Sequence, residues 1–240
     1  MSIAAALLSA ACTATSPAHT VALVELYTSQ GCSSCPPADR WLSALQSSVP
    51  PDRAIPLALH VGYWDYIGWK DPFARREFNA RHSDLAAANR NRSVYTPGVF
   101  LQGRETPEWR DTRAFKAAVQ AINATAPRAT LALAARIDDG AVEVTVDASG
   151  ALQQPRIALA LAQSGFATAV TAGENRGAKL ANDHVARAWQ STPGASASAR
   201  FALPAGVPAA QLDVVAWVQD GTAPAPLQAV RLPLAQCRRD

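Results

Sequence analysis

Residues 21–37 have the sequence Val-Ala-Leu-Val-Glu-Leu-Tyr-Thr-Ser-Gln-Gly-Cys-Ser-Ser-Cys-Pro-Pro, an apolar run followed by two closely spaced cysteines. The apolar run predicts a buried strand, and the two prolines suit the first turn of a helix. Cys32 and Cys35 then stand where the strand ends and the helix begins. At that position the unpaired N–H groups and the positive end of the helix dipole stabilise a thiolate, which is the form that attacks disulfides.

The segments that follow the cysteines alternate between helix and strand. They are, in order, helix 37–45, strand 55–61, helix 71–89, a loop, strand and turn over 94–103, and helix 111–126. Asp71-Pro72 is typical of a helix start, because a capping residue is followed by a proline in the first turn. The alternation predicts an α/β fold with a largely parallel sheet covered by helices.

The pattern changes after residue 127. Strand-like segments 131–137 and 141–147 flank Asp138-Asp139-Gly140, a strong hairpin signal, and further strands are expected at 156–163 and 212–219. This half predicts a small all-β domain resembling a sandwich. We therefore divide the chain into a signal peptide (1–18), an α/β domain (19–127) and a β-rich domain (128–240).

Composition limits the classes of partner. Apolar residues make up 49% of the chain and charged residues 17%, which is typical of a globular protein, and the net charge is only +3. The arginines of residues 75–92 are interleaved with acidic and apolar residues and form no basic stripe. Nucleic acid is therefore not an expected partner.

The first residues resemble a secretory signal. An apolar stretch ends in the small residues Ser16-Pro17-Ala18, which predicts cleavage after Ala18. This stretch is too short to span a bilayer, and no later stretch approaches about 18 apolar residues, so we expect no membrane-spanning helix. The sequence thus indicates an exported protein, periplasmic or secreted.

The two remaining cysteines, Cys12 and Cys237, lie near the chain ends. The residues before Cys12 also resemble a lipoprotein cleavage site, so a lipid anchor at Cys12 is an alternative. We expect instead that Cys12 is discarded with the signal. Cys237 would then be an odd thiol, either an exposed bystander or a partner in a mixed or intermolecular disulfide.

Five segments together resemble the bacterial domain-of-unknown-function 1223 family. They are Leu-Tyr-Thr-Ser-Gln-Gly-Cys-Ser-Ser-Cys-Pro-Pro-Ala-Asp at 26–39, Tyr-Trp-Asp-Tyr-Ile-Gly-Trp-Lys-Asp-Pro-Phe at 63–73, Val-Tyr-Thr-Pro at 94–97, Gly-Glu-Asn at 173–175 and Gln-Asp at 219–220. The resemblance implies an exported protein whose N-terminal domain is thioredoxin-like. It implies no particular substrate.

A pair of cysteines two residues apart has three explanations: half of a zinc site, a structural disulfide or a redox couple. Zinc needs two more ligands, and His60, His82, His184 and Cys237 show no supporting spacing, so we expect no metal and no cofactor. A structural disulfide that closes so small a loop gains little chain entropy. Redox chemistry is the favoured interpretation, with Cys32 as the attacking residue and Cys35 as the resolving one.

Two further roles concern Pro97 and Glu25. The resemblance implies that Pro97 is a cis proline facing the cysteines, and that the backbone of Thr96 pairs with a bound peptide. Strand alternation places Glu25 on the same face as Val21, Leu23 and Tyr27, where an acid is unexpected. We interpret Glu25 either as a buried carboxylate that takes the proton of Cys35 or as a partly exposed strand end.

The aromatic loop 63–70 supplies the last candidates. Trp64 and Asp65 are expected to line a substrate site beside the cysteines, whereas Trp69 is expected to pack. We assign no chemistry to residues 173–177.

The sequence predicts an exported thiol–disulfide oxidoreductase that acts on protein or small-molecule thiols. The alternative is a non-enzymatic binding or assembly protein that uses the reduced pair to hold a soft metal such as Cu(I), or that binds a partner protein. The sequence leaves the substrate and the direction of electron flow open.

Overall fold

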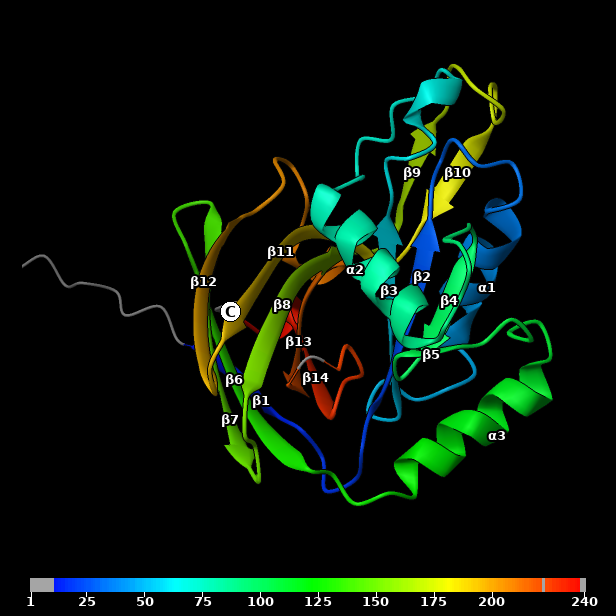
Figure 1. Cartoon of the computed structure of the whole chain (residues 1–240). Helices are drawn as coiled ribbons and strands as arrows, with labels where there is room; N and C mark the ends of the chain where they lie inside the picture. Colours follow the sequence, from blue (N-terminus) through cyan, green and yellow to red (C-terminus); the bar gives the residue numbers. More distant parts are fainter. Residues whose placement is uncertain (1–10, 222, 238–240) are drawn as a thin grey trace, which may run out of the picture.

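A computed structural model describes residues 11–221 and 223–237, and its central feature is one large mixed sheet. This eight-stranded sheet has the order β14-β13-β8-β11-β3-β2-β4-β5 (Figure 1). Its strands are β2 (Ala22–Thr28), β3 (Ala54–His60), β4 (Gly98–Leu101), β5 (Arg104–Glu105), β8 (Pro155–Gln163), β11 (Val185–Pro193), β13 (Leu212–Asp220) and β14 (Gln228–Pro233). β2 is parallel to β3 and antiparallel to β4.

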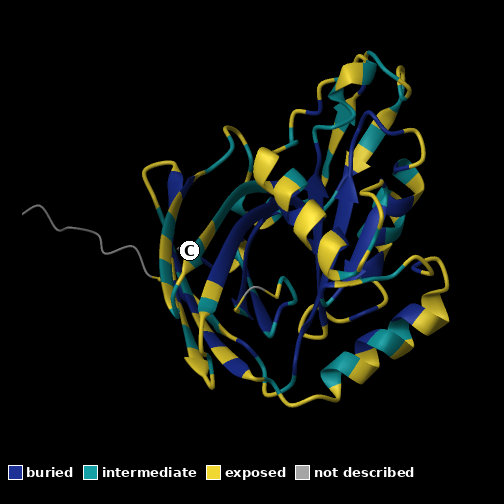
Figure 2. Ribbon diagram, viewed as in Figure 1, coloured by how far each residue is buried: buried dark blue, intermediate teal, exposed yellow. Residues whose placement is uncertain are grey.

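Three α-helices lie against this sheet, and both of its faces are covered. They are α1 (Pro36–Leu45), α2 (Arg76–Ala88) and α3 (Thr112–Asn123). Alternate residues of β2 divide between two cores: Leu23 and Tyr27 pack with α2, while Val24 and Leu26 pack with α1 and α3. Burial on both faces explains why β2 is a continuous apolar run (Figure 2). Within the described residues, none of the helices has the length and apolarity needed to cross a membrane.

A second sheet of four antiparallel strands packs on the other end of the large one. Its order is β1-β6-β7-β12, with β1 (Cys12–Thr15), β6 (Ala129–Asp138), β7 (Ala141–Gly150) and β12 (Ser196–Ala202). Its apolar side chains share a core with those of β8, β13 and β14. The remaining strands, β9 (Phe166–Ala169) and β10 (Lys179–Asn182), form a separate hairpin, and short 3-10 helices occupy 65–67, 209–211 and 234–237.

The structure is a mixed α/β fold in which β-strands predominate. The predicted Asp138-Asp139-Gly140 hairpin joins β6 and β7. The predicted boundary at 127/128, however, separates segments that share one sheet: β11 pairs with β8 on one side and with β3 on the other. The four-stranded sheet packs on β8, β13 and β14, and these strands belong to the same sheet as β2 and β3.

The second helix begins later than predicted. α2 starts at Arg76, not at Asp71. The Asp71 carboxylate accepts from the backbone N–H of Phe73 at 2.9 Å and also lies 2.7 Å from the ring of His60. The sequence pattern predicted Asp71 as the cap of this helix, but in the fold its carboxylate contacts His60 and the backbone of Phe73 instead.

The structure corrects the predicted fate of Cys12 and Cys237. Their sulfurs form a disulfide that joins β1 to the last 3-10 helix, with Cα atoms 4.9 Å apart. Cleavage after Ala18 would remove β1, which pairs with β6, together with one half of this bond. In this structure Cys12 and Cys237 are therefore paired with each other, which disagrees with the predictions of a discarded Cys12 and an odd thiol at Cys237. Residues 1–10 of the predicted signal lie outside the described residues.

Candidate active site

Cys32 and Cys35 lie in the turn that joins the end of β2 to the start of α1. This is the edge of the sheet at which the parallel strands β2 and β3 both end. The two residues form a disulfide with Cα atoms 5.4 Å apart, and their exposed fractions are 2% and 0%. The predicted pair is therefore present in its oxidised form and is covered by neighbouring loops.

Thr96 and Pro97 reach this disulfide from the segment before β4. The Thr96–Pro97 peptide bond is cis, as the resemblance implies. The carbonyl oxygen of Thr96 lies 3.9 Å from Cys32 Sγ. The side-chain hydroxyl of Thr96 accepts from Trp64 Nε1 at 2.6 Å. The structure thus places Thr96, Pro97 and Trp64 near the cysteines, while their predicted roles in catalysis and substrate binding stay predictions.

The start of α1 offers fewer hydrogen-bond donors than its position suggests. Pro36 and Pro37 occupy its first two positions and have no N–H. The Ser34 hydroxyl lies 3.4 Å from Cys32 Sγ, but the N–H of Ser33 donates to the carboxylate of Glu174 at 3.0 Å. A Cys32 thiolate would therefore share the helix start with a carboxylate.

The loop between β9 and β10 forms hydrogen bonds to the turn that contains Cys32 and Cys35. The Asn175 side-chain amide donates to the carbonyl oxygens of Gln30 and Cys32, at 2.9 and 3.0 Å. Sequence reasoning missed this function. The Gly-Glu-Asn segment contributed to the family resemblance, but nothing local ties it to a turn 143 residues away in sequence.

Polar side chains gather below the disulfide where β2 and β3 end. The Thr28 hydroxyl donates to Asp39 at 2.7 Å, and Asp71 accepts from the backbone N–H of Gln30 at 2.8 Å and contacts His60 Nδ1 at 2.7 Å. Asp39 lies one helical turn after Cys35, which places both side chains on the same face of α1. A titratable cluster thus stands beside the resolving cysteine.

Burial and mutual contact change the proton affinities of this cluster. Removal from water raises the pKa of Asp39 to about 6, although His60 and the Thr28 hydroxyl oppose the change. For His60, burial disfavours the charged ring, but Asp71 outweighs it and raises the pKa. Burial alone would raise the pKa of Asp71, yet His60 and two backbone N–H groups lower it. His60 and Asp71 therefore form a charged pair, and Asp39 titrates near neutrality.

Glu25 is fully buried on the face predicted, but its partners differ from those expected. Its carboxylate forms a two-oxygen ion pair with Arg81 of α2, at 2.6 and 2.8 Å, and accepts from the Tyr27 hydroxyl at 2.9 Å. Arg81 also donates to the side chain of Gln219 at 3.0 Å. Gln219 belongs to the Gln-Asp segment that contributed to the family resemblance. Glu25 therefore joins β2 to α2, on the face of the sheet opposite α1.

The side chains of the aromatic loop 63–70 have different neighbours. Trp64 contacts the cysteine turn, whereas Asp65 accepts from the backbone N–H of Asp71 at 3.1 Å and so stabilises the loop itself. Trp69 donates to the side chain of Gln30 at 3.3 Å. The hydrogen bond between Asp65 and Asp71 does not involve the disulfide, so the predicted role of Asp65 in substrate binding stays a prediction.

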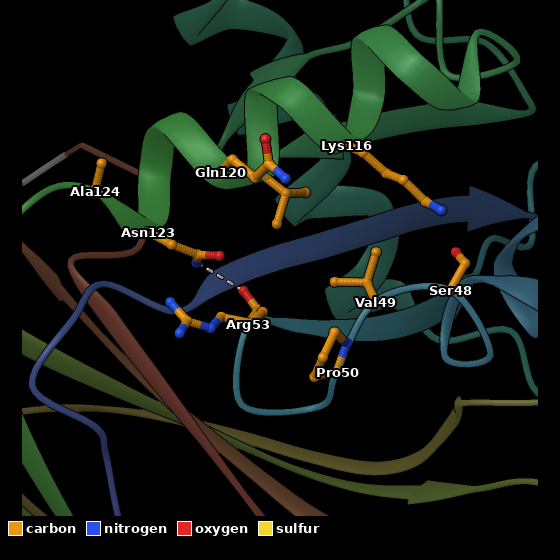
Figure 3. Close-up of a pocket in the computed structure, with 9 residues that line it drawn as sticks. Ser48, Val49, Pro50, Arg53, Lys116, Gln120, Asn123 and Ala124 are labelled. Atoms are coloured by element: carbon orange, nitrogen blue, oxygen red, sulfur yellow. Dashed lines mark hydrogen bonds between the residues drawn. The ribbon is translucent and has the colours of Figure 1, made fainter.

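The pocket drawn in Figure 3 lies far from this site along the sheet. It is lined by the end of α3 and by residues just before β3, including Val49, Arg53, Lys116 and Asn123, and has a volume of about 450 Å³. That is the edge at which β2 and β3 begin, whereas ligands of α/β sheets bind beyond the ends of the strands. A smaller hollow of about 190 Å³ is lined by Tyr95, Pro97 and Trp109 among others, and so includes the cis proline of the site.

The part of the chain that the structure describes contains no group of three or more histidine, cysteine or acidic side chains placed to hold a metal ion.

Comparisons with known proteins identify a family and a fold. The model of the DUF1223 family, described as protein of unknown function, matches residues 23–219. A crystal structure of an Agrobacterium tumefaciens protein is 24% identical, with a TM-score of 0.64 over 89% of this chain and 94% of that one. HBP35 of Porphyromonas gingivalis is 12% identical, with a TM-score of 0.68 over 90% of this chain and 76% of that one. Comparison with proteins of curated function gives no match.

Proposed function

The chain belongs to the DUF1223 family of proteins of unknown function, and from that premise we propose that it is an exported thiol–disulfide oxidoreductase. The proposal rests on the Cys32–Cys35 disulfide, which stands at the strand-to-helix turn with the Thr96 carbonyl 3.9 Å from Cys32 Sγ. A Cys-X-X-Cys pair in the first turn of the β2-α1-β3 unit favours a thioredoxin-like arrangement. Two disulfides in the described residues favour an oxidising compartment.

The proposed chemistry is a two-step exchange. In the reduced protein, the Cys32 thiolate attacks one sulfur of a substrate disulfide, and the other substrate sulfur leaves as a thiolate. Cys35 then loses its proton and attacks Cys32 Sγ, which releases the second substrate thiolate and forms the Cys32–Cys35 bond. Two electrons pass from the protein to the substrate, and the reverse sequence oxidises a substrate dithiol.

Asp39 is our candidate for the group that accepts the Cys35 proton, in place of Glu25. Glu25 is held by Arg81 on the α2 face, whereas Asp39 lies one turn from Cys35 on α1. Its raised pKa of about 6 suits proton transfer near neutral pH. The His60–Asp71 ion pair lies close to Asp39 at the ends of β2 and β3, and its charges act on the Asp39 carboxyl group.

The test is a glutathione redox titration combined with an insulin-reduction assay. Wild type should exchange disulfides, and Cys32→Ser should lower the rate at least about 100-fold, because the attacking sulfur is gone. Cys237→Ser is the matched control, since it removes a sulfur from the other disulfide and should leave the rate unchanged. The proposal fails if wild type exchanges with no thiol, or if its potential lies below roughly −300 mV, as expected of an inert structural bridge.

A further inference from the structure

The loop between β9 and β10 makes three hydrogen bonds to the cysteine turn. Glu174 accepts from the N–H of Ser33 at 3.0 Å, and Asn175 donates to the carbonyl oxygens of Gln30 and Cys32 at 2.9 and 3.0 Å. α1 and β10 are also in contact, and the hairpin stands at the same end of the molecule as the start of α1 (Figure 1). A segment remote in sequence therefore places a carboxylate beside the two cysteines.

The Glu174 carboxylate accepts from one of the few N–H groups at this helix start. Pro36 and Pro37 have no N–H, so the amides of the Cys-X-X-Cys turn supply much of the positive potential at this helix start. Glu174 takes one of them, and its own pKa is lowered by the Ser33 hydrogen bonds, so the bound form is the anion. A negative charge next to Cys32 disfavours a second negative charge on its sulfur.

We propose that Glu174 is a positioning residue that makes the Cys32–Cys35 couple less oxidising, with Asn175 holding it in place. This inference rests on the proposed function, because it assumes that the pair cycles between disulfide and dithiol. Oxidising power rises when the reduced form is stabilised, and Glu174 opposes the thiolate that appears only in that form. The disulfide itself carries no charge, so the oxidised form is little affected.

The equilibrium with glutathione measures this effect directly. Two glutathione thiols reduce the protein disulfide to Cys32 and Cys35 thiols and form one glutathione disulfide, with two electrons moving to the protein. Glu174→Gln keeps the size of the side chain and an oxygen that can accept from Ser33. We expect it to raise the equilibrium constant for reduction threefold to tenfold, equal to about 15 to 30 mV.

Glu143→Gln is the matched control, because it removes the same charge from the exposed face of β7. It should leave the equilibrium constant unchanged. The difference between wild type and Glu174→Gln should shrink to less than about twofold in 1 M salt, where the Debye length is about 3 Å. A merely structural role for Glu174 would not depend on salt in this way.

Asn175→Ala provides a second, independent variant. It keeps the charge but removes both donors to the turn, so Glu174 should leave Ser33 and the equilibrium constant should again rise. An unchanged constant in Glu174→Gln, while wild type titrates normally, overturns the inference and leaves the proposed function intact. A wild type that no thiol reduces would instead overturn the proposed function itself.

Discussion

The two disulfides of this chain lie in opposite surroundings. Cys32–Cys35 spans three residues at a strand-to-helix turn and has Asp39, His60 and Glu174 on the elements around it. Cys12–Cys237 spans 225 residues and joins an apolar core shared by two sheets. Polar and titratable side chains surround the first bond, whereas the second lies among the apolar side chains of the core shared by the two sheets.

The difference separates two uses of the same bond. Cross-linking residues far apart removes much of the conformational freedom of the unfolded chain, whereas closing a loop of a few residues removes little. Cys12–Cys237 is therefore expected to stabilise the fold, and Cys32–Cys35 is expected to carry chemistry. The predictions below test this division in order of decreasing effect.

The largest expected effect is on stability, in Cys237→Ser. Loss of the long-range bond should lower the free energy of unfolding by about 2 to 5 kcal/mol, because the unfolded chain regains the freedom that the cross-link removes. The measurement is urea unfolding of oxidised protein, with and without the substitution. Cys12→Ser should give the same loss, since either change breaks the same bond.

Cys35→Ser supplies the contrast for this experiment. It removes the short-range bond, which loop-closure entropy makes worth about 2 kcal/mol, against about 5 kcal/mol for the 225-residue loop. Cys35→Ser should therefore destabilise the protein less than half as much, while disulfide exchange is lost. If Cys35→Ser destabilised the protein as much as Cys237→Ser does, the two bonds would not differ in the way that their loop lengths imply.

The next effect is a pH dependence of stability that belongs to Asp39. Burial raises its pKa from the ordinary 3.8 to about 6, so the folded protein holds a proton in this range that the unfolded chain has lost. The contribution of Asp39 to stability should therefore fall by about 2 kcal/mol as pH rises from about 4 to 6, and Asp39→Asn should remove this part of the slope. Unfolding by urea at several pH values measures it.

The other groups with shifted pKa values either titrate outside this pH range or contribute equally to wild type and Asp39→Asn. His60 has a raised pKa and loses its contribution only above 6.5, while Asp71 has a lowered pKa and loses its contribution below 3.8. Burial raises the pKa of Asp213 and lowers those of His82 and His184 to about 4, but all three residues are present in both proteins and cancel in the difference. Asp139→Asn, at an exposed turn, is the control for the same chemical change; an unaltered slope in Asp39→Asn would remove Asp39 as the proton acceptor.

Local signals in the sequence predicted much of the fold. The apolar run of β2, the start of a helix at residue 111 and the Asp138-Asp139-Gly140 hairpin each depend on neighbours within a few residues, and each is present. The pairing of β11 between β3 and β8 depends on strands far apart in the chain. Periodicity marks a strand but not its partner, so the sharing of one sheet by both halves was not predictable.

The candidate site shows the same limit. Cys32, Cys35, Thr96 and Trp64 were identified from motifs, and the structure brings them together. The acids were harder to assign, because their roles depend on partners. Glu25 pairs with Arg81 across 56 residues, and Glu174 reaches Ser33 across 141. An unexpected acid on a buried face indicates that a partner exists but does not identify it.

The smallest expected effect comes from the hydroxyl nearest the reactive sulfur. Ser34 Oγ lies 3.4 Å from Cys32 Sγ, where a hydroxyl can donate a hydrogen bond to the thiolate of the reduced protein. Ser34→Ala should lower the equilibrium constant for reduction by glutathione about fivefold, opposite in sign to Glu174→Gln, because a neutral hydrogen bond contributes about 1 kcal/mol. Ser47→Ala, beyond the other end of α1, is the control. An increase in the constant for Ser34→Ala would mean that donors at this helix start do not stabilise the thiolate, and the contrast between the two disulfides would then rest on loop length alone.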